Sequence, residues 1–377
     1  MENLPLLKLM QGNENLLAMN STKIFISPAL MIVLLSTGLM NHVLVLPLLL
    51  DQSGRDAWIS VLVSIPPFFL WLGVLYYIMR KTNQQSLMQL IQQKFGNLAF
   101  LLIVIPLELF LLAITIITLK ETTYWISIDF LKATPIFVIA FCIMLLCSMT
   151  ALAGISSIAQ MSALFLPMVV LFGFFVMLTN MPYKHYSWLL PMMQNGWGPV
   201  WKGSLYSAGG LVEILFLLLF QHHIKQKVKF WHLVMIGIIL VGLTLGPLLA
   251  AIAEFGPHLA IKQRHPAYEE WRLAELTTYI SHFDIISLFQ WMSGAVIRIA
   301  MSLYLCVDVL NFKSIRVRNS ALWVISCAVL VLALVPISDT EYYGMLKNHY
   351  FPLLIAMVIL ISLVLLIFSY TIQFKRG

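Results

Sequence analysis

The chain has 377 residues, of which 60% are hydrophobic and only 10% charged, and its mean hydropathy is +0.91. A soluble domain carries roughly a quarter charged residues, so this chain cannot cover a water-facing surface. The apolar residues come in blocks of about 20, the length with which a helix spans a bilayer. The composition therefore excludes a soluble protein and predicts an all-α integral membrane protein.

The first 26 residues mix acidic, basic and apolar side chains, among them Glu2, Lys8 and Glu14. They lack the basic start, apolar middle and small-residue cleavage site that mark a secretory signal, in that order. We expect residues 1–26 to form a cytoplasmic N-terminal segment. Residues 27–377 are expected to form a single transmembrane domain.

Ten apolar blocks follow in chain order, separated by charged or Pro/Gly-rich breaks. The predicted spans are Ser27–Leu50, Ala57–Met79, Leu98–Leu119, Pro135–Ala153, Ile158–Thr179, Val200–Phe220, Phe230–Ala253, Tyr279–Val307, Ala321–Ile337 and Phe351–Ile372. An even number of spans places both ends of the chain on the same side of the membrane.

The basic residues indicate which side that is. Thirteen Lys and Arg residues lie in the connections on one side: Lys8, Lys23, Arg80, Lys81, Lys94, Lys225, Lys227, Lys229, Lys313, Arg316, Arg318, Lys375 and Arg376. The connections on the other side carry more acids than bases. Short loops rich in Lys and Arg stay in the cytoplasm, so both termini are predicted to be cytoplasmic. The net charge of +7 is then a topological signal and not a nucleic-acid-binding surface.

Two spans contain residues that weaken a helix at mid-depth. The first carries Ser36-Thr37-Gly38, and the sixth carries Ser207-Ala208-Gly209-Gly210 at a similar depth. Small residues also allow close helix packing, which is the simpler explanation for any one site. These two spans open the halves 27–179 and 200–372, however, and enter the membrane from opposite sides. Matching interruptions of this kind predict two inverted five-helix repeats with a binding site at mid-membrane, where exposed helix N-termini favour a carboxylate.

Three ionisable residues lie well inside predicted spans: Glu108, Glu213 and Arg298. Such side chains are expensive in a bilayer and usually face a polar interior. Glu213 follows the glycine pair by one helical turn, so it is predicted to line the same cavity. A structural ion pair or a hydrogen-bonded glutamate remains the alternative explanation.

These features define a set of candidate ligand-binding residues. They are Thr37, Gly38, Leu39, Glu108, Ser207, Ala208, Gly209, Gly210, Glu213, Ser293, Arg298 and Ser302. Ser293 and Ser302 carry less weight, because a serine in a membrane helix more often bonds the carbonyl four residues earlier.

The remaining polar and aromatic features favour ordinary roles. We expect His222 and His223, beside Lys225, to lie in a solvated loop, and Trp125 to anchor a span end at the membrane interface. No hydrolase, phosphate-binding or metal-ligand motif is present. The sequence therefore predicts no catalytic residue, no metal and no cofactor.

One stretch of the sequence resembles a known family. The run from Pro47 to Ser60, containing Gly-Arg-Asp-Ala-Trp-Ile-Ser, follows the first span directly, and a second similar stretch runs from His265 to Trp291. Both resemble spore germination receptor B subunits, the GerAB-type family of the amino acid–polyamine–organocation superfamily. The likeness extends over nearly the whole chain in length and layout.

The resemblance implies a ten-helix subunit in the inner membrane of a bacterial spore. Such a subunit senses a small nutrient germinant, for example an amino acid, together with A and C subunits. Its partners would be that ligand, those subunits and membrane lipid, with no nucleic acid.

A secondary transporter (permease) of amino acids or polyamines is the alternative, and a purely structural scaffold is a third possibility. Some proton-coupled relatives carry a lysine in the fifth helix, whereas Ile158–Thr179 has no ionisable residue, which counts against that coupling scheme.

Overall fold

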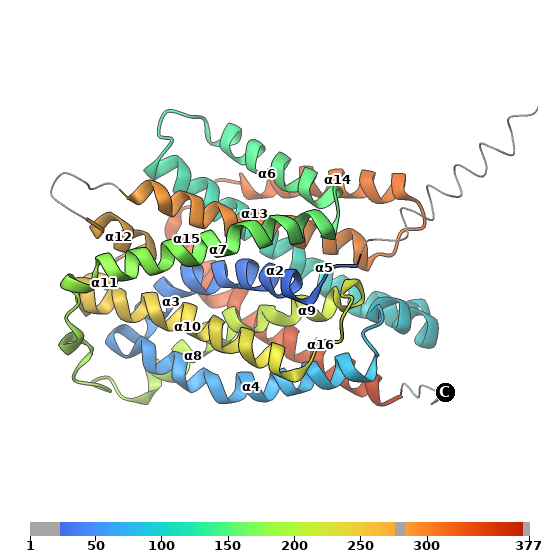
Figure 1. Ribbon diagram of the computed structural model, residues 1–377, viewed down its shortest axis with the longest axis horizontal. Coiled ribbons are helices and arrows are strands. Elements are labelled where there is room, and N and C mark those ends of the chain that lie inside the picture. The colour runs from blue at the N-terminus through green and yellow to red at the C-terminus, as the bar shows by residue number, and fades with distance from the viewer. Residues whose placement is uncertain (1–22, 276–282, 372–377) are drawn as a thin grey trace, which may run out of the picture.

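The computed structural model describes residues 23–275 and 283–371, and it is a bundle of long helices (Figure 1). The elements in chain order are α2 (Ile26–Leu39), η1 (Met40–Leu44), α3 (Val45–Ser53), η2 (Gly54–Asp56), α4 (Ala57–Lys81), α5 (Leu87–Asp129), α6 (Ile136–Leu152), α7 (Ile155–Thr179), η3 (Met181–Tyr183), η4 (Tyr186–Leu189), α8 (Trp197–Leu211), η5 (Val212–Leu215), α9 (Phe216–Leu219), η6 (Gln221–His223), α10 (Phe230–Phe255), α11 (Pro257–Ala260), α12 (Pro266–Leu273), α13 (Asp284–Val309), α14 (Ile315–Ala333), α15 (Asp339–Met345), η7 (Leu346–Tyr350) and α16 (Phe351–Thr371). Among the described residues no strand is formed, and one isolated parallel bridge joins Ile24 to Ile224.

Eight helical runs among the described residues are long and apolar enough to cross a membrane, and the shorter α6 is also apolar. The first run, Ile26–Lys81, reverses direction at Gly54, whose φ of +56° is a conformation that glycine adopts readily. Each of the ten predicted spans therefore coincides with an apolar helix. Three parts of these predictions lie outside the described residues: the first residues of the span predicted to start at Tyr279, the last residue of the tenth span (Ile372), and residues 1–22 of the N-terminal segment.

The helices divide into central and peripheral ones. In the most apolar part of α13, 89% of the residues are buried within the protein, compared with 11% in α7 and 17% in α14. α13 packs against α5, α2 and α7, while α8 packs against α4 and α3. Because α7 and α14 keep apolar side chains on the outside, they face lipid, and the α2–α3, α8–α9 and α13 helices form the centre.

The first and sixth spans both contain a segment that departs from α-helical geometry. In each span this segment lies after the small residues that led us to expect it, not at them. The α-helical geometry of the first span gives way to a π-helical turn at Met40–Leu44, just after Ser36-Thr37-Gly38. The α-helix of the sixth span changes to a 3₁₀ turn at Val212–Leu215, just after Gly209 and Gly210. Neither segment is unwound, so the interruptions are changes of helical pitch and not breaks.

Candidate functional site: a buried ion pair between the central helices

Arg298 and Glu213 form an ion pair at the centre of the bundle. Arg298 Nη2 donates to Glu213 Oε1 at 2.7 Å, and Nη1 donates to Oε2, so the contact is bidentate. Both side chains have no solvent exposure. Glu213 lies in the 3₁₀ turn η5. The pair therefore joins the irregular part of the sixth span to α13.

Two further contacts fix the guanidinium group. Arg298 Nε donates to Thr118 Oγ1 of α5 at 2.8 Å, and Nη1 donates to the Ser36 carbonyl of α2 at 3.1 Å. Removing a charge from water costs several kcal/mol per ion, and excellent geometry with extra hydrogen bonds is needed to offset this. Arg298 of α13 thus contacts the sixth span, α5 and α2 at once.

Several hydroxyl groups beside the pair lack a hydrogen-bond partner among the described residues. They are Ser36 Oγ, Thr37 Oγ1 and Ser302 Oγ. Ser302 follows Arg298 by one turn on the same face of α13. The Tyr350 hydroxyl is hydrogen-bonded to the Glu213 carboxylate. Buried polar groups are nearly always bonded, so the oxygens of Ser36, Thr37 and Ser302 are candidates for hydrogen bonds to a polar ligand.

Asn41 connects the two irregular segments to each other. Its Nδ2 donates to the Gly210 carbonyl at 3.1 Å and to the Thr37 carbonyl at 2.9 Å, while its Oδ1 accepts from Thr244 Oγ1 at 3.2 Å. Asn41 lies inside the π-helical turn, and Gly210 stands two residues before the 3₁₀ turn. The amide is a buried polar bridge between the first and sixth spans.

The small residues of the predicted site serve close packing. A Cβ atom at Gly209 would lie 2.5 Å from Phe351 Cδ1, and one at Gly210 would lie 2.4 Å from Asn41 Oδ1. At Gly38 it would lie 3.3 Å from Leu243 Cδ1. The glycines therefore let neighbouring helices approach, as the simpler reading of each site alone predicts.

Other candidates lie farther from the pair or make local contacts. Ser207 Oγ is hydrogen-bonded to Ser64 Oγ at 2.8 Å, Ala208 is half-buried, and Leu39 packs against Gly294 of α13. Ser293 Oγ donates to the Phe289 carbonyl four residues earlier. Glu108 interacts with Cys306 and does not join the Arg298–Glu213 pair.

Two sequence interpretations are wrong. His223 is only 5% exposed and bonds Asp308 of α13, so this histidine does not lie in a solvated loop, while His222 is partly exposed. Trp125 is 1% exposed and stacks on Trp291 with ring centroids 4.1 Å apart, so it is a core residue and not an interfacial anchor. In both cases the partner is far along the chain, and no local pattern indicates it.

Sequence reasoning also missed Thr118 and Asn41 as members of the site. Thr118 donates to the Ile114 carbonyl, the ordinary bond of a membrane threonine, and accepts from Arg298 with the same oxygen. From the sequence only the bond between Thr118 and the Ile114 carbonyl can be expected, and the contact with Arg298 cannot. Asn41 stands in an apolar run, and its polarity is the one signal that could have found it.

Comparison with known proteins agrees with this membrane architecture. The profile of the family described as "Spore germination protein" matches residues 22–342. Spore germination protein XB of Bacillus anthracis is 38% identical over 341 residues, which cover 90% of this chain and 96% of that protein. The putative spore germination protein YfkT of Bacillus subtilis (strain 168) is 24% identical over 284 residues, 73% of this chain and 76% of that protein. This multi-pass membrane protein therefore belongs to the spore germination protein family.

Proposed function

We propose that the chain is the ligand-sensing membrane subunit of a germinant receptor, and that it binds a zwitterionic small molecule such as an amino acid between Arg298 and Glu213. The supporting observation is the fully buried bidentate pair, together with three neighbouring hydroxyl groups that have no hydrogen-bond partner among the described residues. Family membership supports the role in germination.

The charges of the pair favour this class of ligand. Separating the pair leaves a buried guanidinium and a buried carboxylate, and an uncompensated buried charge costs about 3–5 kcal/mol. An amino acid supplies a carboxylate for Arg298 and an ammonium for Glu213, so it can replace both partners at once. A ligand with one charge leaves one group unpaired.

Such an exchange would alter the contacts between central helices. Glu213 belongs to the sixth span, while Arg298 also holds α2 and α5 through Ser36 and Thr118. A ligand shifts a conformational equilibrium only by its difference in affinity for the two states. In our proposal the paired state is the unliganded one, and A and C subunits respond to the separated state. The subunit would lie in the spore inner membrane with both termini in the cytoplasm.

The test measures binding to the purified protein in lipid nanodiscs, using labelled amino acids beside their matching amines and carboxylic acids. We expect an amino acid to bind at least about 100-fold more tightly than either singly charged analogue, since the unpaired charge costs about 3–5 kcal/mol. If the matching amine bound as tightly as the amino acid, the proposal that the ligand replaces both partners of the ion pair would be contradicted.

A double variant, Glu213→Gln with Arg298→Gln, removes both charges together and should accumulate without binding. Its matched control is Asp51→Asn with Lys347→Gln, which neutralises a partly exposed pair and should bind normally. Binding that persists in the first double variant would place the ligand elsewhere. Uptake of the amino acid into liposomes would favour the permease instead.

A further inference from the structure

His222, His223 and Asp308 converge where the sixth span and α13 end. His222 Nε2 lies 3.4 Å from Asp308 Oδ2, and His223 Nε2 lies 3.1 Å from the same oxygen. All three ligand atoms lie within 4.8 Å of one another, the one such group of histidine, cysteine or acidic residues among those described. Asp308 is 85 residues from His223 in the sequence, so folding assembles the group.

These separations match the coordination shell of a small metal ion. Zinc binds histidine nitrogen and carboxylate oxygen at roughly 2.0–2.2 Å in a tetrahedron, which places neighbouring ligand atoms about 3.4 Å apart. The two imidazole rings have their centroids 3.9 Å apart and their planes tilted by 41°, and the Nε2 atoms of both face one carboxylate oxygen. One ion can therefore contact all three groups with little movement.

The backbone that carries the histidines is held from two sides. The Ile24 amide donates to the His223 carbonyl at 2.8 Å, and the Lys225 amide donates to the Ile24 carbonyl at 2.9 Å. Gln221 Nε2 donates to Thr82 Oγ1 and to the Gln85 carbonyl. Ligands that are fixed before binding lose less entropy when the ion arrives.

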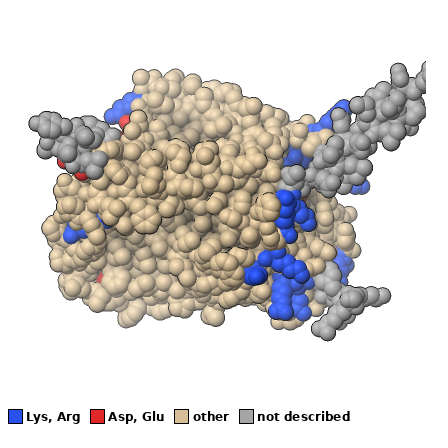
Figure 2. Space-filling view, viewed as in Figure 1, with Lys and Arg blue, Asp and Glu red and all other residues tan. Residues whose placement is uncertain are grey.

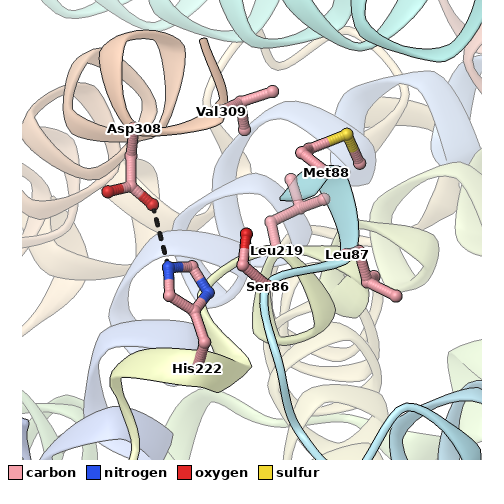
Figure 3. A pocket seen from close by; sticks show the side chains of 7 residues that line it. All are labelled: Ser86, Leu87, Met88, Leu219, His222, Asp308 and Val309. Carbon is pink, nitrogen blue, oxygen red and sulfur yellow. Dashed lines mark ion pairs between the residues drawn. The ribbon is translucent and has the colours of Figure 1, made fainter. Parts of the chain in front are cut away.

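The group is open to a small cavity, which provides a way in. Figure 3 shows His222 directed toward Asp308 beside Ser86 and Leu219. The side chains of His222 and Asp308 are 23% and 17% exposed. Tyr304, one helical turn before Asp308, brings its hydroxyl to 3.2 Å from His223 Nε2, the nitrogen that also faces Asp308, so a bound ion would replace this hydrogen bond.

We propose that His222, His223 and Asp308 bind a divalent transition-metal ion, for which zinc is the best match. Two imidazoles and one carboxylate suit zinc, whereas calcium and magnesium prefer oxygen ligands alone. Three protein ligands leave a fourth position, which water fills from the cavity. Binding requires neutral imidazoles, so it displaces any proton held by the coordinating nitrogens.

The ion would act on the same two helices that the Arg298–Glu213 pair joins. Asp308 follows Arg298 by ten residues on α13, about 15 Å along the helix axis, and His223 follows Glu213 by the same number. Metal at this end would hold the sixth span and α13 together whether or not the pair is separated.

The test uses the full chain, purified in detergent with an affinity tag free of histidine. After equilibration with excess zinc and dialysis, elemental analysis should give one zinc per chain, and cobalt in its place should give visible absorption bands. Asp308→Asn and His222→Gln should each lower zinc affinity at least about tenfold. His258→Gln, which changes an exposed histidine elsewhere, should leave the affinity unchanged.

Two results would overturn the proposal. One is a chain that retains no zinc after dialysis, because the three groups would then form only a hydrogen-bonded cluster. The other is equal zinc affinity in the parent chain and in Asp308→Asn, which would place the ion elsewhere. Cobalt absorption distinguishes a lost ligand from misfolding, since a folded Asp308→Asn chain that still binds weakly shows shifted bands.

Discussion

Arg298 uses its planar fork in a way that lysine cannot reproduce. Three of its nitrogens donate to Glu213, Thr118 and the Ser36 carbonyl. Arg298→Lys keeps the charge but loses the bidentate contact and the bond to Thr118. We expect a loss of about 1.5–3 kcal/mol in the free energy of unfolding, the value of a hydrogen bond to a charged group.

Thermal unfolding in detergent measures this loss. Arg272→Lys is the matched control, because Arg272 is largely exposed where it pairs with Glu269. Its effect should stay below about 0.5 kcal/mol. Equal shifts in melting temperature for Arg298→Lys and Arg272→Lys would mean that the hydrogen bonds of the buried guanidinium group do not stabilise the fold.

Gly210 illustrates packing at the level of one methyl group. In Gly210→Ala the new Cβ would lie 2.4 Å from Asn41 Oδ1 and 2.8 Å from Val45 Cγ2. Overpacking of this kind typically costs about 1–3 kcal/mol, so the melting temperature should fall. Gly242→Ala, in α10, meets no atom within 4 Å and should be neutral or slightly stabilising. The opposite ranking would contradict the packing role.

Glu270 should make stability depend on pH. Burial, and then the neighbouring Glu254, hold the pKa of Glu270 well above its usual 4.5, while Lys184 acts in the opposite direction. The folded state therefore favours the protonated carboxyl. Its contribution to stability is complete below pH 4.5, the unfolded value, and is lost as the pH rises through the folded pKa.

Glu270→Gln keeps the neutral form at every pH. Its melting temperature should change less between pH 5 and pH 9 than that of the parent chain. Glu269→Gln is the control, because that neighbouring side chain is partly exposed and paired with Arg272. A variant that loses stability with pH as steeply as the parent chain would rule out Glu270 as the cause.

At the scale of elements, Asn41 holds the π-helical turn of the first span against the sixth. Asn41→Ala removes its bonds to the carbonyls of Thr37 and Gly210, while Thr244 Oγ1 keeps its bond to the Leu240 carbonyl. A buried group left unsatisfied costs about 1–3 kcal/mol, and we expect a loss in that range. Asn97→Ala, at an exposed position bonded to Gln92, should cause little change in melting temperature.

The same element shows what a sequence can and cannot predict. The ten spans follow from apolar blocks alone, because a helix in lipid must satisfy its own backbone groups. Ser36-Thr37-Gly38 indicated where the first helix is weak, but the turn that departs from α-geometry lies a few residues on, at Met40–Leu44. Contact between Asn41 and Gly210, 169 residues apart, accompanies this shift, and such pairings leave no local signal.

The candidate site was likewise predictable from the sequence only in part. Intramembrane charge identified Glu213 and Arg298 but also Glu108, which lies apart from them. Sequence spacing could not decide between an open cavity and an ion pair, because the answer depends on how α13 packs beside the sixth span. The division into two inverted repeats, 27–179 and 200–372, stays a proposal.

At the scale of the whole molecule, the charge distribution predicts orientation. Figure 2 shows Lys and Arg side chains gathered at one end of the bundle, with few at the other. We expect Lys227→Cys to react with a membrane-impermeant thiol reagent only from the cytoplasmic side, and Lys262→Cys only from the opposite side. Sealed vesicles of known orientation provide the measurement, with the parent chain as background. If Lys227→Cys reacted only from the outside and Lys262→Cys only from the cytoplasmic side, the predicted orientation would be wrong.

The pairing of Arg298 with Glu213 also bears on electrical behaviour. The two charges cancel inside the bundle, and an amino acid that separated them would add no net charge. A full charge carried across the membrane gains or loses about 2.3 kcal/mol for every 100 mV of transmembrane voltage. Occupancy by a zwitterion should therefore be insensitive to the membrane potential, so the receptor would respond equally in an energised membrane and in a fully depolarised one.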